Sequence, residues 1–331
     1  MTRHVRWVPR LIGPAILVYF LLTTDIAKIV ANLRILRWAP LLLSLALYPI
    51  MVAIKTWRWT GVMRSLGLEP PRLRASMNLY MIGLFLGGAT PGQSGDFLKA
   101  WYLRDRGQPL APVLFSILLD RLFDFLAMAM LSLLGLSAFL HRFPEQLRAP
   151  IQSVSIGLAA ATALMIPVLM ARRPRNWLMC QAVRLTPRRT HAALERWRRQ
   201  LDSPDIGPVL LGSLLLATAC SAASTIARLW LLFTALDVGI PLLALVSSVA
   251  LISVVQVLPI SFAGVGVRDA VLITVLAVYG YGPDKALALS ALFLLINLEH
   301  ILIGFLVSLR HPLGRGPAAD PRRAQPSAAR T

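Results

Sequence analysis

The sequence predicts an all-α polytopic membrane protein with about six full transmembrane helices and two opposed re-entrant helical hairpins in an inverted repeat. Three observations support this fold class. Hydrophobic residues make up 56% of the 331 positions and charged residues only 15%, with a mean hydropathy of +0.66. Apolar runs of about 20 residues recur, which is the length that a helix needs to cross a bilayer. Two further apolar regions are broken by glycine and proline at corresponding places in the two halves, as in transporters built from inverted repeats.

Six apolar stretches are long enough to cross the ~30 Å hydrocarbon core of a bilayer. The first follows several arginines, as a signal peptide would, but it ends without a small-residue cleavage site. We therefore expect it to remain as an uncleaved first span. The six stretches are 11–30, 39–60, 111–140, 152–171, 206–236 and 285–309.

The two broken regions are 77–103 and 242–280. The pieces on either side of Pro91 hold about a dozen residues each, so a helix made from one would reach only roughly 20 Å. A re-entrant hairpin is therefore expected there. The pieces around Pro259 are longer, so a hairpin is less strongly required in the second region.

An alternative topology makes 77–103 one kinked span and 242–280 two spans, with the N-terminus outside. The re-entrant topology places more of the loop lysines and arginines on the cytoplasmic side. The positive-inside rule therefore favours it, with both termini in the cytoplasm.

These elements are expected to form a single integral membrane domain made of two inverted halves. Arg58 and Arg228 are 170 residues apart, and Pro91 and Pro259 are 168 apart, so a nearly constant offset indicates an internal duplication. A basic cytoplasmic loop either lies on the inner leaflet as an amphipathic helix or is solvated. The expected boundaries are 1–310 for the domain, 10–140 and 150–310 for its halves, 172–204 for the basic loop, and 311–331 for a disordered basic cytoplasmic tail.

Each helix break offers a candidate anion site. A helix that restarts after Pro91 has free N–H groups inside the membrane, and Gly92 and Gly95 allow close approach to the backbone. Gly264 and Gly266 precede the second restart in the same way. A lipid phosphate is the natural anion for such sites. The alternative is that the acidic residues Asp96 and Asp269 only cap these helices.

Three charged residues, Asp120, Arg121 and Asp124, lie within five positions of the predicted span 111–140. Each would cost about 3 kcal/mol at the bilayer centre, so they must be paired or hydrated. Asp120 and Asp124 share a helix face. The group could be a structural ion-pair network, the wall of a headgroup cavity, or a proton-coupled carboxylate pair, and its depth is left open. Arg228 and the pair Glu299-His300 are further polar insertions.

The sequence lacks the motifs that identify several classes of enzyme. The sequence contains no Gly-x-x-x-x-Gly-Lys-Ser/Thr loop, no His-Glu-x-x-His motif and no Gly-x-Ser-x-Gly elbow. Cys180 and Cys220 are isolated, so neither a disulfide nor a metal cluster is indicated. We therefore expect no enzyme activity, no catalytic residue, no cofactor and no metal. The net charge of +19 resides largely in loops, which favours anionic lipid over nucleic acid as a partner.

Three motifs stand out in this order: Pro91-Gly92-x-x-Gly95-Asp96-x-x-Lys99-Ala100, Asp120-Arg121-x-x-Asp124 and Gly264-x-Gly266-Val267-Arg268-Asp269-Ala270. Together they resemble the lysylphosphatidylglycerol synthase transmembrane region family of flippase-like membrane proteins, from about residue 10 to 310. Members often carry glutamate where this chain has Asp96, Asp120 and Asp269. The resemblance implies movement of a lipid or lipid-linked headgroup across a bacterial or archaeal cytoplasmic membrane. No counterpart of the soluble synthase domain is seen, so aminoacyl transfer is not expected.

The expected function is therefore that of a flippase or transporter with a polar site near the bilayer midplane. Its arginines would bind the phosphate of an anionic phospholipid, and its aspartates would orient them or carry a coupling proton. Alternatives are a non-catalytic partner of a lipid synthase or glycosyltransferase, and a membrane enzyme acting on lipid phosphate. The expected substrate-binding residues are Pro91, Gly92, Gly95, Asp96, Lys99, Asp120, Arg121, Asp124, Arg228, Gly264, Gly266, Arg268 and Asp269.

Overall fold

The computed structural model is helical throughout the part of the chain that it describes, and no strand occurs there. The predicted first span 11–30, the glycines Gly264 and Gly266 of the second break, and the tail 311–331 lie outside this part. The described residues are 31, 33–88, 90–139, 145–186, 188–201, 207–257 and 267–310.

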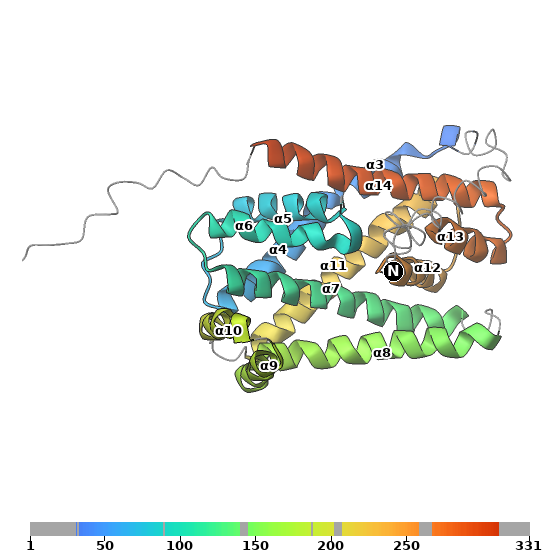
Figure 1. Cartoon of the computed structure of the whole chain (residues 1–331). Helices are drawn as coiled ribbons and strands as arrows, with labels where there is room; N and C mark the ends of the chain where they lie inside the picture. The colour runs from blue at the N-terminus through green and yellow to red at the C-terminus, as the bar shows by residue number, and fades with distance from the viewer. Residues whose placement is uncertain are drawn as a thin grey trace, which may run out of the picture.

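Helices of very different length share the bundle. In chain order they are α3 (Trp38–Ala46), α4 (Tyr48–Ser65), α5 (Leu73–Gly88), the 3₁₀ helix η2 (Pro91–Leu98), α6 (Lys99–Arg104), α7 (Leu110–Phe139), α8 (Glu145–Met170), α9 (Arg172–Leu185), α10 (Arg188–Gln200), α11 (Pro208–Ala235), α12 (Leu242–Val257), α13 (Val267–Val278) and α14 (Pro283–Arg310). Helices α7, α8 and α14 run along the molecule, α4 and α11 cross them obliquely, and α9 and α10 lie crosswise at one end (Figure 1).

Four helices in the described residues are long and apolar enough to cross a membrane. Leucines on their outer surface, such as Leu164 and Leu216, are 68% and 66% exposed, as expected for side chains that face lipid. The four spans coincide with predicted spans 39–60, 152–171, 206–236 and 285–309: they are Trp38–Ser65, which joins α3 and α4, Arg148–Met170, Pro208–Ala235 and Pro283–Arg310.

Helix α7 matches the predicted span 111–140 in position and has 30 residues, or about 45 Å of helix. It is not among the four apolar spans, and it carries the three charged residues of the Asp120–Asp124 segment. The interior of the bundle must therefore accommodate these charges.

The chain reverses direction at the first predicted break. Helix α5 ends at Gly88, and η2 returns along it, so closely that a Cβ on Gly95 would collide with the carbonyl of Leu86. Thr90 Oγ1 secures the turn, because it donates to Leu86 O at 2.8 Å and accepts from Gly95 N at 2.6 Å. With 16 residues, α5 is about 24 Å long and shorter than a bilayer core.

Each broken region packs on a long helix from the other half of the sequence. Helix α5 packs along α14, and α12 packs along α7. A glycine allows each close approach: a Cβ on Gly304 would collide with the α5 backbone at Met81, and one on Gly135 would collide with Ser247 of α12. Ser247 Oγ also donates to Gly135 O at 2.8 Å. Small residues at helix contacts are typical of membrane bundles.

The ends of α4 and α11 have the same turn. Gly67 and Asp237 both have positive φ, 73° and 53°, and lie 170 residues apart. In each turn the residue that follows donates back across the helix end, from Leu68 N to Met63 O at 3.0 Å and from Val238 N to Phe233 O at 2.9 Å. This is the hydrogen bond of a Schellman helix end.

A second pair of turns recurs after α6 and α13. Gly107 and Gly280 have φ of 84° and 79°. Gln108 N donates to Leu103 O and Tyr281 N to Leu276 O, both at 3.1 Å. The chain thus enters α7 and α14, the last long helix of each half, through matching turns.

Candidate functional site

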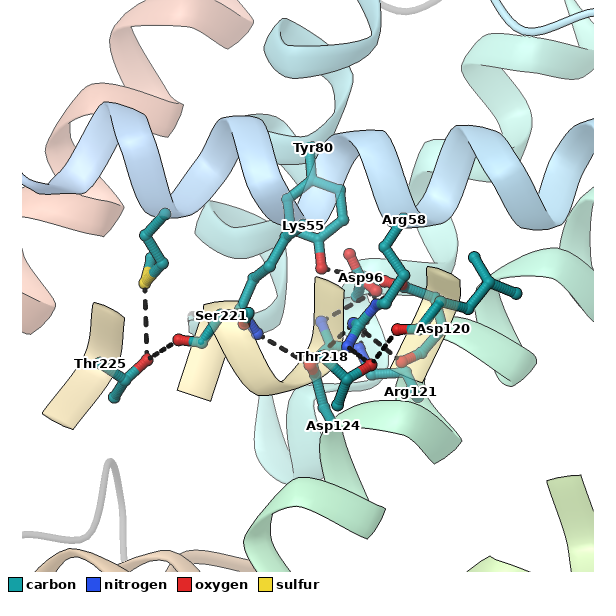
Figure 2. Close-up of polar contacts among 12 residues, drawn as sticks. Lys55, Arg58, Tyr80, Asp96, Asp120, Arg121, Asp124, Thr218, Ser221 and Thr225 are labelled. Atoms are coloured by element: carbon teal, nitrogen blue, oxygen red, sulfur yellow. Dashed lines mark hydrogen bonds and ion pairs between the residues drawn. The ribbon is translucent and has the colours of Figure 1, made fainter. Parts of the chain in front are cut away.

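Seven charged residues from four elements of the first half meet inside the bundle. We call them the charge cluster: Lys55 and Arg58 of α4, Asp96 of η2, Lys99 of α6, and Asp120, Arg121 and Asp124 of α7. Figure 2 shows six of them, all except Lys99, converging beside Thr218 of α11. Four of the seven are basic and three are acidic, so the fully ionised cluster has one positive charge in excess.

Arg58 is the centre of the charge cluster. Its Nε donates to Asp120 Oδ1 at 2.8 Å, and its Nη2 donates to Asp124 Oδ1 at 2.7 Å. Nη1 donates to Thr218 Oγ1 of α11 at 3.2 Å. The side chain is fully buried, so this one guanidinium joins α4, α7 and α11 without contact with solvent.

The two aspartates of α7 point the same way, as their four-residue spacing predicts. Tyr80 OH donates to the second oxygen of Asp120, Oδ2, at 2.9 Å. Lys55 Nζ lies 2.9 Å from Asp124 Oδ1. Asp120 is therefore enclosed between an arginine and a tyrosine, whereas Asp124 lies between two cations and remains 12% exposed.

Asp96 pairs with two cations. Arg121 Nε donates to its Oδ2 at 2.9 Å, and Lys99 Nζ lies within 3.0 Å of both carboxylate oxygens. Room for this carboxylate comes from Gly83 of α5, where a Cβ would collide with Asp96 Oδ1. Asp96 is the sixth residue of η2 and lies outside its first turn, so its side chain does not act as the simple helix cap considered from the sequence.

Lys99 is held between two aromatic rings. Its ammonium lies 4.6 Å from the ring centroid of Trp59 and 4.6 Å from that of Tyr80. Such cation–π contacts stabilise a desolvated ammonium by about 2 kcal/mol. Trp59 is itself fixed by a bond from its Nε1 to Ser116 Oγ at 3.2 Å.

Arg228 belongs to a second polar group, on α11, α14 and the α3–α4 span. Its guanidinium pairs with Glu299, lies 2.8 Å from His300 Nε2, and donates from Nε to Ser44 O at 2.8 Å. The His300 ring stacks on Tyr48, with centroids 4.7 Å apart. The Tyr48 hydroxyl is buried and has no hydrogen-bond partner among the described residues.

Arg268 and Asp269 form a third group at the start of α13. Ser290 of α14 joins them: its hydroxyl accepts from Arg268 Nη2 at 2.7 Å and donates to Asp269 Oδ1. Arg268 is 1% exposed, and its Nη1 has no hydrogen-bond partner within the part of the chain described.

The predicted site residues therefore separate into groups. The structure brings together Asp96, Lys99, Asp120, Arg121 and Asp124, whereas it places Arg228 and Arg268 in the other two groups. Pro91 and Gly92 begin η2, and Gly95 supports packing on α5. Gly264 and Gly266 lie outside the described residues.

Sequence reasoning did not identify two members of the charge cluster, Lys55 and Arg58, or the tyrosine that contacts it, Tyr80. Arg58 was used only to align the two halves. Two cations within the predicted span 39–60 were the available signal, since intramembrane charges require partners.

Comparison with known proteins agrees with this membrane architecture. Searches among curated proteins and solved structures find no significant match to the chain. The model of one family, however, matches residues 8–304, which include all three polar groups. The chain therefore belongs to the lysylphosphatidylglycerol synthase transmembrane region family.

Proposed function

We propose that this protein is a flippase that moves an anionic phospholipid or lipid-linked headgroup across the cytoplasmic membrane of its cell. The family points to lipid metabolism at a membrane. The observation that carries the proposal is the positive charge in excess within the charge cluster, since an anionic headgroup would neutralise it. In a low-dielectric interior such an attraction is far stronger than in water.

The exposed edge of the charge cluster is the proposed headgroup site. Lys55 and Arg121 keep 16% and 13% of their side chains exposed, whereas Arg58 and Lys99 are fully enclosed. A phosphate at this edge would bind Arg121 through two parallel hydrogen bonds and Lys55 as a point charge. Arg58 and Lys99 would hold the aspartates in place. Arg228 and Arg268 lie in the other two polar groups, away from this edge, and we assign them positioning roles.

The proposed transport path follows from an inverted repeat with two re-entrant hairpins. The matching turns after α4 and α11, and the exchange of α5 and α12 between the halves, support it. In this arrangement the first hairpin comprises α5, η2 and α6, the second comprises α12 and α13, and both termini lie in the cytoplasm. Sites of this kind occur near the midplane, where broken helices meet.

Lipid translocation in proteoliposomes tests the proposal. Lys55→Gln removes the excess charge, yet Asp124 keeps Arg58 as a partner, so the fold should survive. Losing one charged contact to phosphate costs about 1.5–3 kcal/mol, so movement of labelled phosphatidylglycerol should fall roughly ten- to hundredfold. Arg104→Gln is the matched control, because Arg104 is 52% exposed and pairs with Asp105 outside the cluster.

Native protein that moves no lipid across a panel of anionic and neutral headgroups would contradict the flippase proposal. Equal activity in the Lys55 and Arg104 variants would retain transport but remove the charge cluster as its site.

One observation favours a second candidate, a non-catalytic partner of a lipid synthase or glycosyltransferase. Each acidic residue of the charge cluster is paired, which also suits a rigid structural network. Co-purification with such an enzyme, together with the absence of lipid movement, would support this candidate.

A further inference from the structure

Helices α9 and α10 form a distinct layer at one end of the bundle. Only Ala171 separates α9 from α8, whose span ends at Met170. Ala171 has extended backbone angles, φ −81° and ψ 134°, so the chain turns sharply there. Figure 1 shows α9 and α10 nearly end-on, whereas α7 and α8 are seen lengthwise. The two helices therefore run across the ends of the spans, at the depth where a span leaves the hydrocarbon.

One side of α9 exposes three large apolar side chains, with Gln181 among them around the helix. Trp177, Leu178 and Leu185 are 61%, 37% and 85% exposed. At about 100° per residue these three side chains fall within roughly a quarter of the helix circumference. Arg175, about 60° beyond Leu178 around the helix, is buried and donates to Leu169 O at 3.3 Å. The apolar stripe thus points away from the protein.

Unneutralised positive charge borders this stripe. Residues 172–200 contain nine arginines and a single acidic residue, Glu195. Glu195 lies 3.8 Å from both Arg198 and Arg199, so its charge is used within α10. Arg173 and Arg184 flank the apolar stripe of α9, are exposed, and pair with no carboxylate of the described residues.

We propose that α9 is a binding surface for the anionic phospholipid headgroups of the membrane that surrounds the protein. Trp177, Leu178 and Leu185 enter the boundary between headgroups and acyl chains, where tryptophan is favoured. Arg173 and Arg184 bind lipid phosphates at the same depth, each contributing about 1 kcal/mol near an anionic surface. A purely solvated loop would leave this stripe in water. The inference stands whether or not the protein transports lipid.

A fluorescent label at position 185 measures this docking in the full-length protein. The label is attached to Leu185→Cys after Cys180→Ser and Cys220→Ser, and the protein is reconstituted with phosphatidylcholine alone or with an equal part of phosphatidylglycerol. Quenching by lipids brominated on the acyl chain reports insertion, and quenching by iodide reports exposure to water. We expect acyl-chain quenching and protection from iodide, both stronger with phosphatidylglycerol.

Two charge variants separate the contributions. Arg173→Gln with Arg184→Gln should weaken docking in phosphatidylglycerol about fivefold for each arginine removed. Arg72→Gln with Arg106→Gln is the matched control, since both residues are exposed loop arginines outside α9 and α10. A label open to iodide in phosphatidylglycerol would overturn the proposal. Protection that is equal in phosphatidylcholine and unchanged by the α9 variants would overturn anionic headgroups as the occupant.

Discussion

Arg58 and Arg228 occupy corresponding places in the two halves of the molecule, yet their surroundings differ. Both are buried arginines on a long helix, 170 residues apart, and each pairs with a carboxylate on the last long helix of its half. Arg58 contacts two aspartates, whereas Arg228 contacts one glutamate and a histidine. Each arginine also donates to a backbone carbonyl. The backbone turns repeat between the halves, but the charges do not. The two arginines thus lie near similar turns but hold different sets of charged partners.

The largest difference should follow removal of these two arginines. Arg58→Met leaves Asp120 and Asp124 short of their shared cation, and breaking a buried ion pair costs about 3–5 kcal/mol. Arg228→Met leaves only one carboxylate, Glu299, without its cation, and Glu299 is 13% exposed. The loss of stability should therefore be smaller. Thermal unfolding in detergent compares the two variants. A midpoint that falls further for Arg228→Met would show that the second group, not the charge cluster, dominates stability.

The two buried tyrosines offer a milder test. Tyr80→Phe removes the hydrogen bond to Asp120 Oδ2, the carboxyl group that pairs with Arg58, and such bonds to charged partners are worth about 1.5–3 kcal/mol. Tyr48→Phe removes a buried hydroxyl that has no hydrogen-bond partner among the described residues, so the unfolding midpoint should shift little or slightly upward. Thermal unfolding in detergent compares the two variants. An equal fall in the unfolding midpoint for both would contradict the difference in hydrogen bonding between Tyr80 and Tyr48.

A substitution at Gly83 tests whether the Asp96 carboxylate needs the space that this glycine leaves. Gly83→Ala places a Cβ against Asp96 Oδ1, and such overpacking typically costs about 1–3 kcal/mol. Gly157→Ala in α8 is the control, because a Cβ there meets nothing within 4 Å and alanine favours a helix. We expect a lower unfolding midpoint for the first variant only. An unaffected Gly83 variant would mean that the hairpin adjusts freely around Asp96.

The smallest effect should appear at the matching turns. Gly67→Ala forces a side chain into the left-handed region and should cost about 1 kcal/mol. Asp237→Gly relieves that strain but loses an exposed ion pair with Arg37, worth about 0–1 kcal/mol, so its net change should be near zero. Unfolding midpoints measured at low and high salt would test both statements, because only the Asp237 variant should lose salt dependence.

The sequence predicted the elements whose signal is local. Spans such as 206–236 and 285–309 follow from apolar length alone, and the reversal near Pro91 follows from its short flanking pieces. The common face of Asp120 and Asp124 follows from helix periodicity. These features depend on neighbouring residues, so one chain is enough to find them.

Partners that come from distant helices could not be predicted in the same way. Nothing near Arg58 in the sequence indicates Asp120, and nothing near Arg228 indicates Glu299. Helix rotation decides these pairs, and α4, with nearly uniform polarity around its axis, gives no clear orientation signal. The separation of Arg228 and Arg268 from the charge cluster had the same cause.

The contact between α5 and α14 also has a consequence for biosynthesis. The α5 surface around Met81 is covered by Gly304, which the ribosome reaches only after more than two hundred further residues. At about 5–20 residues per second, α5 waits on the order of 10 to 40 s for its partner. The α5 surface around Met81 is therefore made long before the helix that covers it, and it stays uncovered until α14 is synthesised.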